Sequence, residues 1–532
     1  MTTVRSTLAR PTVAALWRAA PGLVAWAAAL ALVRPLVMGY LTNPPDQRLV
    51  DLDVYRTGGI SVLHGQPVYH ALTQAPQLLA FTYPPIAALF AVPFAMVSWP
   101  AAQVMWVAFI YIPLAITVHY AFRPLLAQAG RYAPVAYAAL FAACAYLFPL
   151  RDQIRFGQVD MLLVALCVAD CAVVAPRWRR GALIGLATAV KLVPGVFIVY
   201  LWLSGRRDAA RTAAASAAAW TLAAFLLLPR DSLYYWTNAI FDSNRLGSNT
   251  GTSNQSLRGV LLRMFLPSAA PGAVWIIVAA LVAVVGFAAA RRMARGGDEL
   301  AGVAITGLLA VLLSPVAWIH HLAWVVVVIG AVVGDGRDRR RLAVAVGIAL
   351  FYTVTLPWWG LSLMKIAWLP KIAGRIVQSS FGLGAIALIP IITWAHRRRV
   401  SGPGRPTHEA APNQRATGGD ADQEADAPAD SEKTQVRSTV WVSRETTSGY
   451  APSSDIARTF GAGPASRGGW HHAGWCGKNA CRKDRRGERR AHPGPIQRGG
   501  RSRPHVPSGM SASYVMTRSR RWQASFPSRS HC

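Results

Sequence analysis

Charged residues are scarce in this sequence, and acidic residues are scarcer than basic ones. Only 15% of its 532 residues are charged, with 24 Asp and Glu against 55 Lys and Arg. Soluble domains carry about 25% charge, so the composition does not suit a water-soluble globular protein. Hydrophobic residues make up 53% of the chain. They gather in runs of about 20 residues, the length at which a helix crosses a bilayer, and this indicates a membrane protein.

Two further absences narrow the fold class. The apolar runs, such as 274–287 and 325–333, lack the alternation of polar and apolar residues that membrane β-strands show. The six cysteines also do not suggest a disulfide framework. Cys144, Cys167 and Cys171 lie inside apolar segments, where free Cys acts as a small hydrophobic residue, and the other three lie after residue 400. Since lipid tolerates only helices and closed barrels, the sequence predicts an all-α, polytopic integral membrane protein.

The basic residues set the expected topology. The formal net charge of +31 could suggest nucleic-acid binding. In the first 400 residues, however, Arg occurs in short clusters between apolar runs, which is the positive-inside pattern, so we predict no nucleic-acid partner. The clusters lie at 123–131, 177–180, 206–211, 291–295, 337–341 and 397–399. If all of them are cytoplasmic, the polar segment 41–80 faces outside.

The clusters divide the apolar runs into about ten to twelve transmembrane helices. The first should be uncleaved, with a cytoplasmic N-terminus, because no small-residue cleavage site follows it. The expected crossings are 13–38, 101–122, 133–147, 161–175, 212–228, 272–290, 300–315, 322–334, 342–358 and 374–394. Segment 84–97 is short and bounded by Pro, which predicts a juxtamembrane or re-entrant helix. Segment 182–203 lies between two basic clusters and should form two short helices with Lys191 near the tip.

The composition changes after residue 400. Residues 401–437 are rich in Pro, Asp, Glu and Thr, and residues 438–532 are crowded with Arg, Gly, Ser, Pro and His. Neither segment can bury a core. We therefore divide the chain into a membrane domain, 1–400, and a disordered basic tail, 401–532. Two origins stay open for 438–532: an arm that touches acidic lipid, or translation of a shifted reading frame, which we favour. His471, His472, Cys476 and Cys481 match no standard zinc spacing.

The topology places four polar groups on the outer side of the membrane. They are Asp51 with Asp53, the segment 151–160, the segment 254–258, and His320 with His321. Each alone is unspecific, because histidine at a helix end is often interfacial and basic side chains near lipid extend toward water. Together they suit transfer from a phosphate-linked donor, since a carboxylate can take a proton and cations can neutralise a departing phosphate.

In their order along the chain, these motifs resemble glycosyltransferase family 87. The resemblance covers about residues 15–395. It rests on Asp-Leu-x-Val-Tyr at 51–55, Gly-x-Pro-x-Tyr at 65–69, Phe-Thr-Tyr-Pro-Pro at 81–85, Phe-Gly-Gln-Val-Asp at 156–160, Gly-Leu-Ala-Thr-Ala-Val-Lys-Leu-Val-Pro at 185–194, Asn-Gln-Ser-Leu-Arg-Gly at 254–259 and the histidine pair. It implies a GT-C fold and an actinobacterial enzyme that uses polyprenyl-phosphate-mannose. Such enzymes add α-1,2-linked mannose to phosphatidylinositol mannosides, lipomannan or lipoarabinomannan.

The resemblance and the chemistry of the residue types together predict roles for individual residues. Asp51 matches the catalytic base, and Asp53 ranks second. The donor phosphate is assigned to Lys191, Arg258, His320 and His321, and substrate binding to Tyr55, Tyr83, Arg155, Gln158, Asn254 and Gln255. No cofactor and no metal-binding residue is expected, and the sequence leaves open whether a divalent metal is required.

The resemblance implies the partners, and the positive-inside topology predicts the location. The partners are the polyprenyl-phosphate-mannose donor, a glycolipid acceptor and the bilayer, at the extracytoplasmic (periplasmic) face of the inner (plasma) membrane. Two alternatives remain. One is a GT-C transferase of another polyprenyl-phosphate sugar, arabinofuranose or glucose. The other is a lipid-linked sugar flippase or transporter, which would place polar residues along a path at the membrane midplane.

Overall fold

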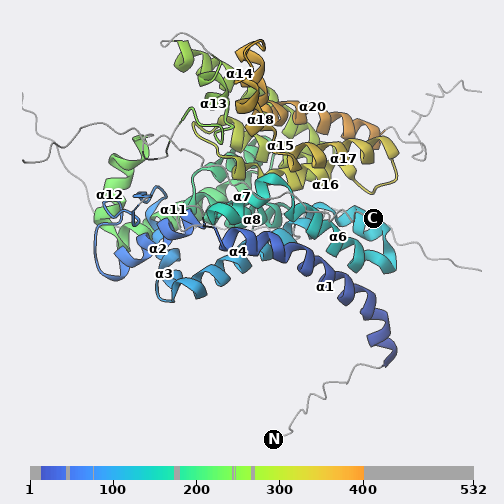
Figure 1. The fold of residues 1–532 in the computed structure, drawn as a ribbon, viewed down its shortest axis with the longest axis horizontal. Coiled ribbons are helices and arrows are strands. Elements are labelled where there is room, and N and C mark those ends of the chain that lie inside the picture. Colours follow the sequence, from blue (N-terminus) through green and yellow to red (C-terminus); the bar gives the residue numbers. More distant parts are fainter. Residues whose placement is uncertain are drawn as a thin grey trace, which may run out of the picture. The chain divides into compact units, whose positions relative to one another are not determined.

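The computed structural model describes residues 13–43, 48–75, 77–172, 180–242, 245, 247, 249–264 and 270–400. This part of the chain is helical (Figure 1), and its β pairing is confined to two isolated bridges, Leu72 with Ala80 and Asn254 with Trp318. The prediction of an all-α protein is confirmed. The predictions for residues 401–532, including the division into two regions, lie outside the described residues.

The helices follow one another closely along the chain. In order they are α1 (Val13–Leu41), α2 (Val50–Leu63), α3 (Pro85–Ala95), α4 (Trp99–Ala121), α5 (Arg123–Gln128), α6 (Ala133–Ala145), α7 (Phe148–Phe156), α8 (Asp160–Ala172), α9 (Ala182–Val190) and α10 (Val196–Leu203). Then come α11 (Arg207–Leu227), α12 (Pro229–Thr237), α13 (Leu257–Leu262), α14 (Ala270–Arg295), α15 (Glu299–Leu313), α16 (Val325–Val333), α17 (Arg339–Thr353), α18 (Leu356–Leu363), α19 (Lys371–Gln378) and α20 (Ser380–Val400). The 3-10 turns η4 (Val193–Gly195) and η7 (Ile319–Trp324) lie next to the candidate site.

Several helices are long and apolar enough to span a membrane. Four such spans lie in α1, α4, α11 and α14, and three bent helix pairs bring the number to seven if each pair is one span. Four shorter apolar helices of 10–17 residues complete the set among the described residues. The expected crossings 13–38, 101–122, 212–228 and 272–290 match the four long spans. The count of ten to twelve stays a prediction, because it needs the shorter helices to cross as well.

The segment that carries Asp51 is a helix, whereas the sequence predicted a polar loop over 41–80. Asp51 and Asp53 lie in the first turn of α2, where carboxylates interact favourably with the positive end of the helix dipole. Gly59 lets α2 approach α3 closely, because a Cβ there would meet the Ala91 carbonyl carbon at 2.9 Å. Glycine at this position therefore allows α2 to pack closely against α3.

The segment 151–160 was also predicted as a loop, and most of it is α7. Gly157 ends this helix with φ of +70°, a backbone conformation that glycine adopts without strain. A Cβ at Gly157 would meet the Leu52 Cβ at 3.0 Å, so α2 lies directly against the turn. Gln158 follows in this turn, and Asp160 begins α8. The turn therefore brings both side chains toward Asp51.

The core is centred on α15 and α16. Every residue from Ala301 to Leu312 and from Val325 to Val333 is buried, and these helices pack against α4, α8 and α20. η7 leads directly into α16, so the buried helix fixes the position of His320 and His321. Lys191 lies at the break between α9 and η4, which confirms the predicted pair of short helices in 182–203.

Candidate active site

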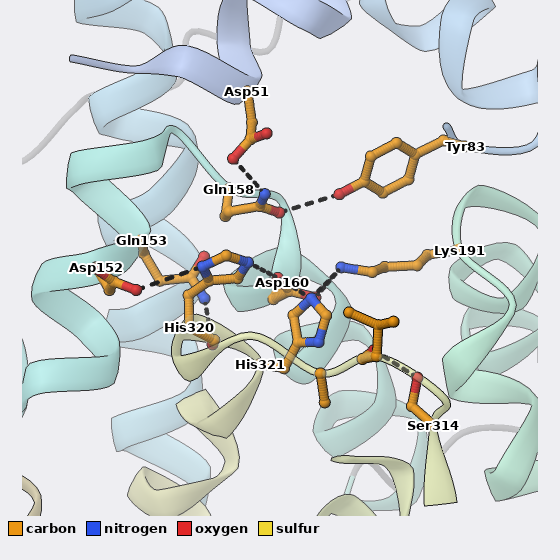
Figure 2. A network of polar contacts seen from close by, with 12 residues as sticks. Asp51, Tyr83, Asp152, Gln153, Gln158, Asp160, Lys191, Ser314, His320 and His321 are labelled. Atoms are coloured by element: carbon orange, nitrogen blue, oxygen red, sulfur yellow. Dashed lines mark hydrogen bonds and ion pairs between the residues drawn. The ribbon is translucent and has the colours of Figure 1, made fainter. Parts of the chain in front are cut away.

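Four separate parts of the chain meet at one group of polar side chains (Figure 2). Asp51 comes from α2, and Gln158 and Asp160 come from the turn between α7 and α8. Lys191 comes from the break after α9, and the histidine pair comes from η7. The predicted residues that the structure brings together here are Asp51, Tyr55, Tyr83, Gln158, Lys191, His320 and His321.

Gln158 is the contact between Asp51 and two tyrosines. Its Nε2 donates to Oδ2 of Asp51 at 2.5 Å. Its Oε1 accepts from the hydroxyls of Tyr55 and Tyr83, both at 3.1 Å. The Tyr55 hydroxyl also lies 2.8 Å from that of Tyr83. With two hydroxyls facing the carbonyl oxygen, the amide nitrogen is held toward the carboxylate.

The surroundings of Asp51 give it the properties of a base. Burial raises the pKa of this carboxyl from 3.8 to about 6. The charges of His320 and Lys191 and the hydrogen bond from Gln158 oppose this rise, whereas Asp160 adds to it. A carboxylate with such a pKa is ionised at neutral pH, yet it binds a proton more readily than an ordinary aspartate does. Pairing of a perturbed pKa with a cluster of polar groups is typical of active sites.

Lys191, Asp160 and His321 form a compact cluster below Gln158. The Lys191 Nζ donates to Oδ1 of Asp160 at 2.7 Å and lies 3.0 Å from Nε2 of His321. It also lies 5.3 Å from the centre of the Tyr83 ring. The cavity beside these side chains measures about 20 Å³, room for about one water molecule. A phosphate could reach this cluster only after the side chains move apart.

His320 is held from both sides. Its Nδ1 lies 3.6 Å from Oδ2 of Asp152, and its backbone oxygen accepts from Nε2 of Gln153 at 2.7 Å. Its Nε2 faces Oδ2 of Asp160 at 3.9 Å. Among the described residues, neither Nε2 of His320 nor Oδ2 of Asp160 has a hydrogen-bond partner, although both are buried. Buried polar groups without partners are costly and often belong to functional sites.

The residues Asp160, His320 and His321 could in principle hold a metal ion, since one donor atom from each lies within 4.8 Å of the others. Carboxylate and imidazole are suitable ligands for zinc. The ammonium of Lys191 nevertheless lies at hydrogen-bond distance from both Asp160 and His321. A positive charge of the protein itself therefore takes the place of a metal, and the donor set fits an ion poorly.

Three of the predicted site residues lie apart from this group. Asp53 is half-buried near Arg56, and burial raises its pKa while the Arg56 charge lowers it. Arg155 lies over the Phe156 ring at 5.2 Å. Arg258 lies over the Trp275 ring at 6.0 Å. Within the described residues, neither arginine side chain makes a hydrogen bond or ion pair with the Lys191 cluster.

Asn254 and Gln255 are completely buried and bonded within the protein. Oδ1 of Asn254 accepts from the backbone nitrogens of Ser256 and Ala317 at 3.2 and 3.1 Å. Nε2 of Gln255 donates to the Thr252 and Gln378 carbonyls, and its Oε1 accepts from Gly382 N. The backbone nitrogen of Gln255 donates to the backbone oxygen of Ala317 at 2.6 Å. These bonds brace the segment before the histidine pair, and the substrate contact of both residues stays a prediction.

Sequence reasoning assigned no role to Asp152, Gln153 or Asp160. Asp160 was placed at the end of the outer polar segment 151–160, directly before the expected crossing 161–175, and an ionised group at a membrane boundary is costly unless it has a partner. That cost was the available signal. Nothing in the sequence indicated that the partner would be Lys191, 31 residues further on.

Comparisons with known proteins agree with the motif order. A family model described as "Glycosyltransferase family 87" matches residues 81–315. A polyprenol-phosphate-mannose-dependent alpha-(1-2)-phosphatidylinositol mannoside mannosyltransferase of Mycobacterium tuberculosis is 32% identical over 365 residues, 64% of this chain and 84% of that protein. Its counterpart in Mycolicibacterium smegmatis is 35% identical over 58% of this chain and 75% of that protein.

One further relative and one solved structure are also similar to this chain. A phosphatidylinositol pentamannoside mannosyltransferase of Mycobacterium tuberculosis is 31% identical over 59% of this chain and 74% of that protein. Among solved structures, ArnT from Cupriavidus metallidurans bound to undecaprenyl phosphate is 14% identical, with a TM-score of 0.26, over 73% of this chain and 78% of that one. A likeness at that level does not support a comparison of sites.

Proposed function

Because the chain belongs to glycosyltransferase family 87, we propose that it transfers mannose from polyprenyl-phosphate-mannose to a phosphatidylinositol mannoside in α-1,2 linkage. The names of its relatives support this donor, acceptor and linkage. For this chain, the proposal rests on the surroundings of Asp51. Its carboxylate, with a pKa of about 6, bonds to Gln158 beside the Lys191 and histidine cluster.

In the proposed reaction Asp51 takes the proton of the acceptor hydroxyl. Gln158 holds one carboxylate oxygen and leaves the other for the acceptor. The hydroxyl oxygen bonds to the anomeric carbon of mannose while the bond from that carbon to the phosphate oxygen breaks. The configuration inverts, and polyprenyl phosphate leaves with the electron pair. Lys191 neutralises its negative charge, and His321 lies beside the Lys191 ammonium. His320 lies close enough to Asp51 to act on it electrostatically.

The proposal is tested by offering the purified protein different polyprenyl-phosphate sugars together with a phosphatidylinositol mannoside. Mannose should be transferred, and linkage analysis should show an α-1,2 bond. Transfer of arabinofuranose or glucose in its place would favour the related transferases. Movement of the lipid-linked sugar across the membrane, without release of polyprenyl phosphate, would contradict the proposed reaction.

The chain is a multi-pass membrane protein, and we place its site at the extracytoplasmic face. The support is the position of the basic clusters relative to the site. α16 begins beside His320 and His321 and ends just before the cluster 337–341. The site and this cluster are thus at opposite ends of one helix. If basic clusters face the cytoplasm, the site faces the other side.

Cysteine labelling tests this orientation. After replacement of the native thiols, Gln66→Cys should react with an impermeant thiol reagent in intact cells, and Arg337→Cys only after lysis. Both positions are exposed, and neither substitution removes a glycine with positive φ. The reverse labelling pattern would place the site at the cytoplasmic face and overturn this part of the proposal.

Gln158 should lower the pKa of Asp51, the carboxylate to which it donates a hydrogen bond. In the wild-type protein, kcat/KM should fall as the pH drops through about 6, because Asp51 must be ionised to accept a proton. Gln158→Leu removes a hydrogen bond to the carboxylate, worth about 1.5–3 kcal/mol for a charged group. The pKa of Asp51 should then rise by about one to two units. The fall of kcat/KM on the acid side of the pH profile, its acid limb, should therefore move to higher pH. Rate measurements from pH 5 to 9 at matched protein levels would detect the shift.

Two sets of tyrosine variants distinguish an effect on the pKa of Asp51 from a general effect on the fold. Tyr83→Phe and Tyr55→Phe remove hydroxyls that orient the Gln158 amide, so each should shift the limb in the same direction by less. Tyr235 is buried and stacks on Tyr69, and no hydrogen bond joins its hydroxyl to Gln158 in the described part of the chain. Tyr235→Phe should therefore leave the limb unchanged. An unshifted limb in Gln158→Leu would mean that another group limits the rate at low pH.

A further inference from the structure

Helices α18 and α19 form a short hairpin that turns away from the spans on either side of it. α18 is bent by 56° from α17, and α19 is bent by 62° from α20. The hairpin is tightly packed, because a Cβ at Gly360 would meet the Gln378 backbone nitrogen at 2.3 Å and one at Gly374 would meet the Met364 Cγ at 2.4 Å. If α17 and α20 cross the bilayer, helices inclined to them by about 60° lie near the membrane plane.

The outward surface of this hairpin is apolar and aromatic. Trp359 and Trp368 are 53% and 81% exposed, and Ile372 and Ile376 are 43% and 48% exposed. The two isoleucines are four residues apart and so share one face of α19. Gly374 and Gln378 are buried on another face. Tryptophan at the boundary between lipid and water and an amphipathic helix with Lys or Arg beside its apolar face are typical of interfacial segments.

The charge of the hairpin has one sign. Lys365 and Lys371 are exposed, and Arg375 follows on α19. From 339 to 400 the sequence contains no Asp or Glu. Basic residues at a membrane surface attract anionic lipid by about 1 kcal/mol each. An acidic protein partner would also suit the lysines, but it would not account for the exposed tryptophans and isoleucines next to them.

Hydrogen bonds place the hairpin at the same end of the bundle as the candidate site. Nε2 of Gln378 donates to Oγ1 of Thr252 at 2.7 Å, and the Gln378 oxygen accepts from Nε2 of Gln255 at 3.0 Å. Gln255 in turn bonds to Ala317, three residues before His320. The far ends of α17 and α20 carry the Arg clusters 339–341 and 397–399.

We propose that the α18–α19 hairpin lies in the headgroup region of the leaflet next to the site and binds anionic phospholipid headgroups there. The apolar face of Ile372 and Ile376 enters the lipid, and Lys365 and Lys371 contact the lipid phosphates. This inference depends on the arrangement of the helices and not on mannose transfer. It can therefore fail while the proposed function holds.

A fluorophore on the hairpin tests the membrane contact. The full chain, with its native thiols replaced, carries bimane at Ile376→Cys in nanodiscs. Nitroxide-labelled lipids should quench it strongly, and iodide in the water phase should quench it weakly. Quenching by iodide alone would place the hairpin in water. Protection from both quenchers would mean that protein, such as a second copy of the chain, covers it, and either result would overturn the proposal.

The choice of lipid tests the charge. Nitroxide-labelled phosphatidylglycerol should quench more than nitroxide-labelled phosphatidylcholine at equal content. The Lys365→Gln/Lys371→Gln double variant should lose this preference, by about fivefold per lysine, the equivalent of ~1 kcal/mol. The control variant, Arg339→Gln/Arg340→Gln, removes the same charge from exposed positions at the other end of α17. This variant should keep the preference for phosphatidylglycerol. Equal quenching by both lipids in the wild-type protein would refute the headgroup binding.

Discussion

An Asp51→Asn variant should transfer mannose about 10²–10⁴-fold more slowly than the wild-type protein at saturating donor and acceptor, because it lacks the proposed general base. The amide keeps the size of the side chain but cannot take the acceptor's proton. Donor binding should survive, since Lys191 and His321 remain in place. The measurement is the transfer rate at matched protein levels. Retention of more than about a tenth of the wild-type rate would exclude Asp51 as the base.

The stability of this variant separates a chemical defect from a folding defect. Burial raises the pKa of Asp51 to about 6. A raised pKa means that the folded state disfavours the ionised form, so the ionised carboxylate destabilises the fold as the pH rises through 6. Asn carries no charge, and the variant should melt at or above the wild-type temperature at pH 7. A much lower melting temperature would contradict this account of the site.

Asp53→Asn is the matched control. The residue lies on the same turn of α2, but its charge faces Arg56 rather than Lys191 and the histidines. We expect most of the transfer rate to remain. If Asp53→Asn is inactive and Asp51→Asn is active, the helix is the correct one and the choice between its two carboxylates is wrong.

The second large effect is expected at Lys191. Lys191→Met removes the cation that we propose neutralises the leaving phosphate, and loss of such a group typically slows turnover about 10²–10³-fold. It also leaves Asp160 buried without its partner. Breaking one side of a buried pair costs about 3–5 kcal/mol. The single variant should therefore lose both transfer and stability, which would not by itself identify its role.

The Lys191→Met/Asp160→Asn double variant separates these two losses. Removing both charges avoids the unpaired carboxylate, so membrane insertion and melting temperature should return toward the wild type. Transfer should stay low, because the phosphate still meets no ammonium. If transfer returns together with stability, the Lys191–Asp160 pair only supports the fold, and another cation must neutralise the phosphate.

The sequence alone determined the fold class and much of the chemistry. Scarce charge and long apolar runs require helices in lipid, because a bilayer offers no partner for unpaired backbone groups. The helix break next to Lys191 was also visible in the sequence, because the nearby proline cannot continue a helix. The ordered motifs around Asp51, Gln158 and the histidine pair indicated the family, which the comparisons confirm. These features depend on local composition and spacing, which a linear sequence carries.

The assembly of the site was decided only by tertiary structure. Asp51 and Asp53 differ by two positions in the sequence, but the packing of α2 turns the first toward Gln158 and the second toward Arg56. The same packing makes a helix of the predicted loop. Asn254 and Gln255 match a motif that suggested substrate contact, and their bonds to Ala317 brace the histidine segment. Lys191 and Asp160 meet from different helices, so no local pattern encodes their pairing. Such contacts arise from how buried faces pack, and packing depends on the whole chain at once.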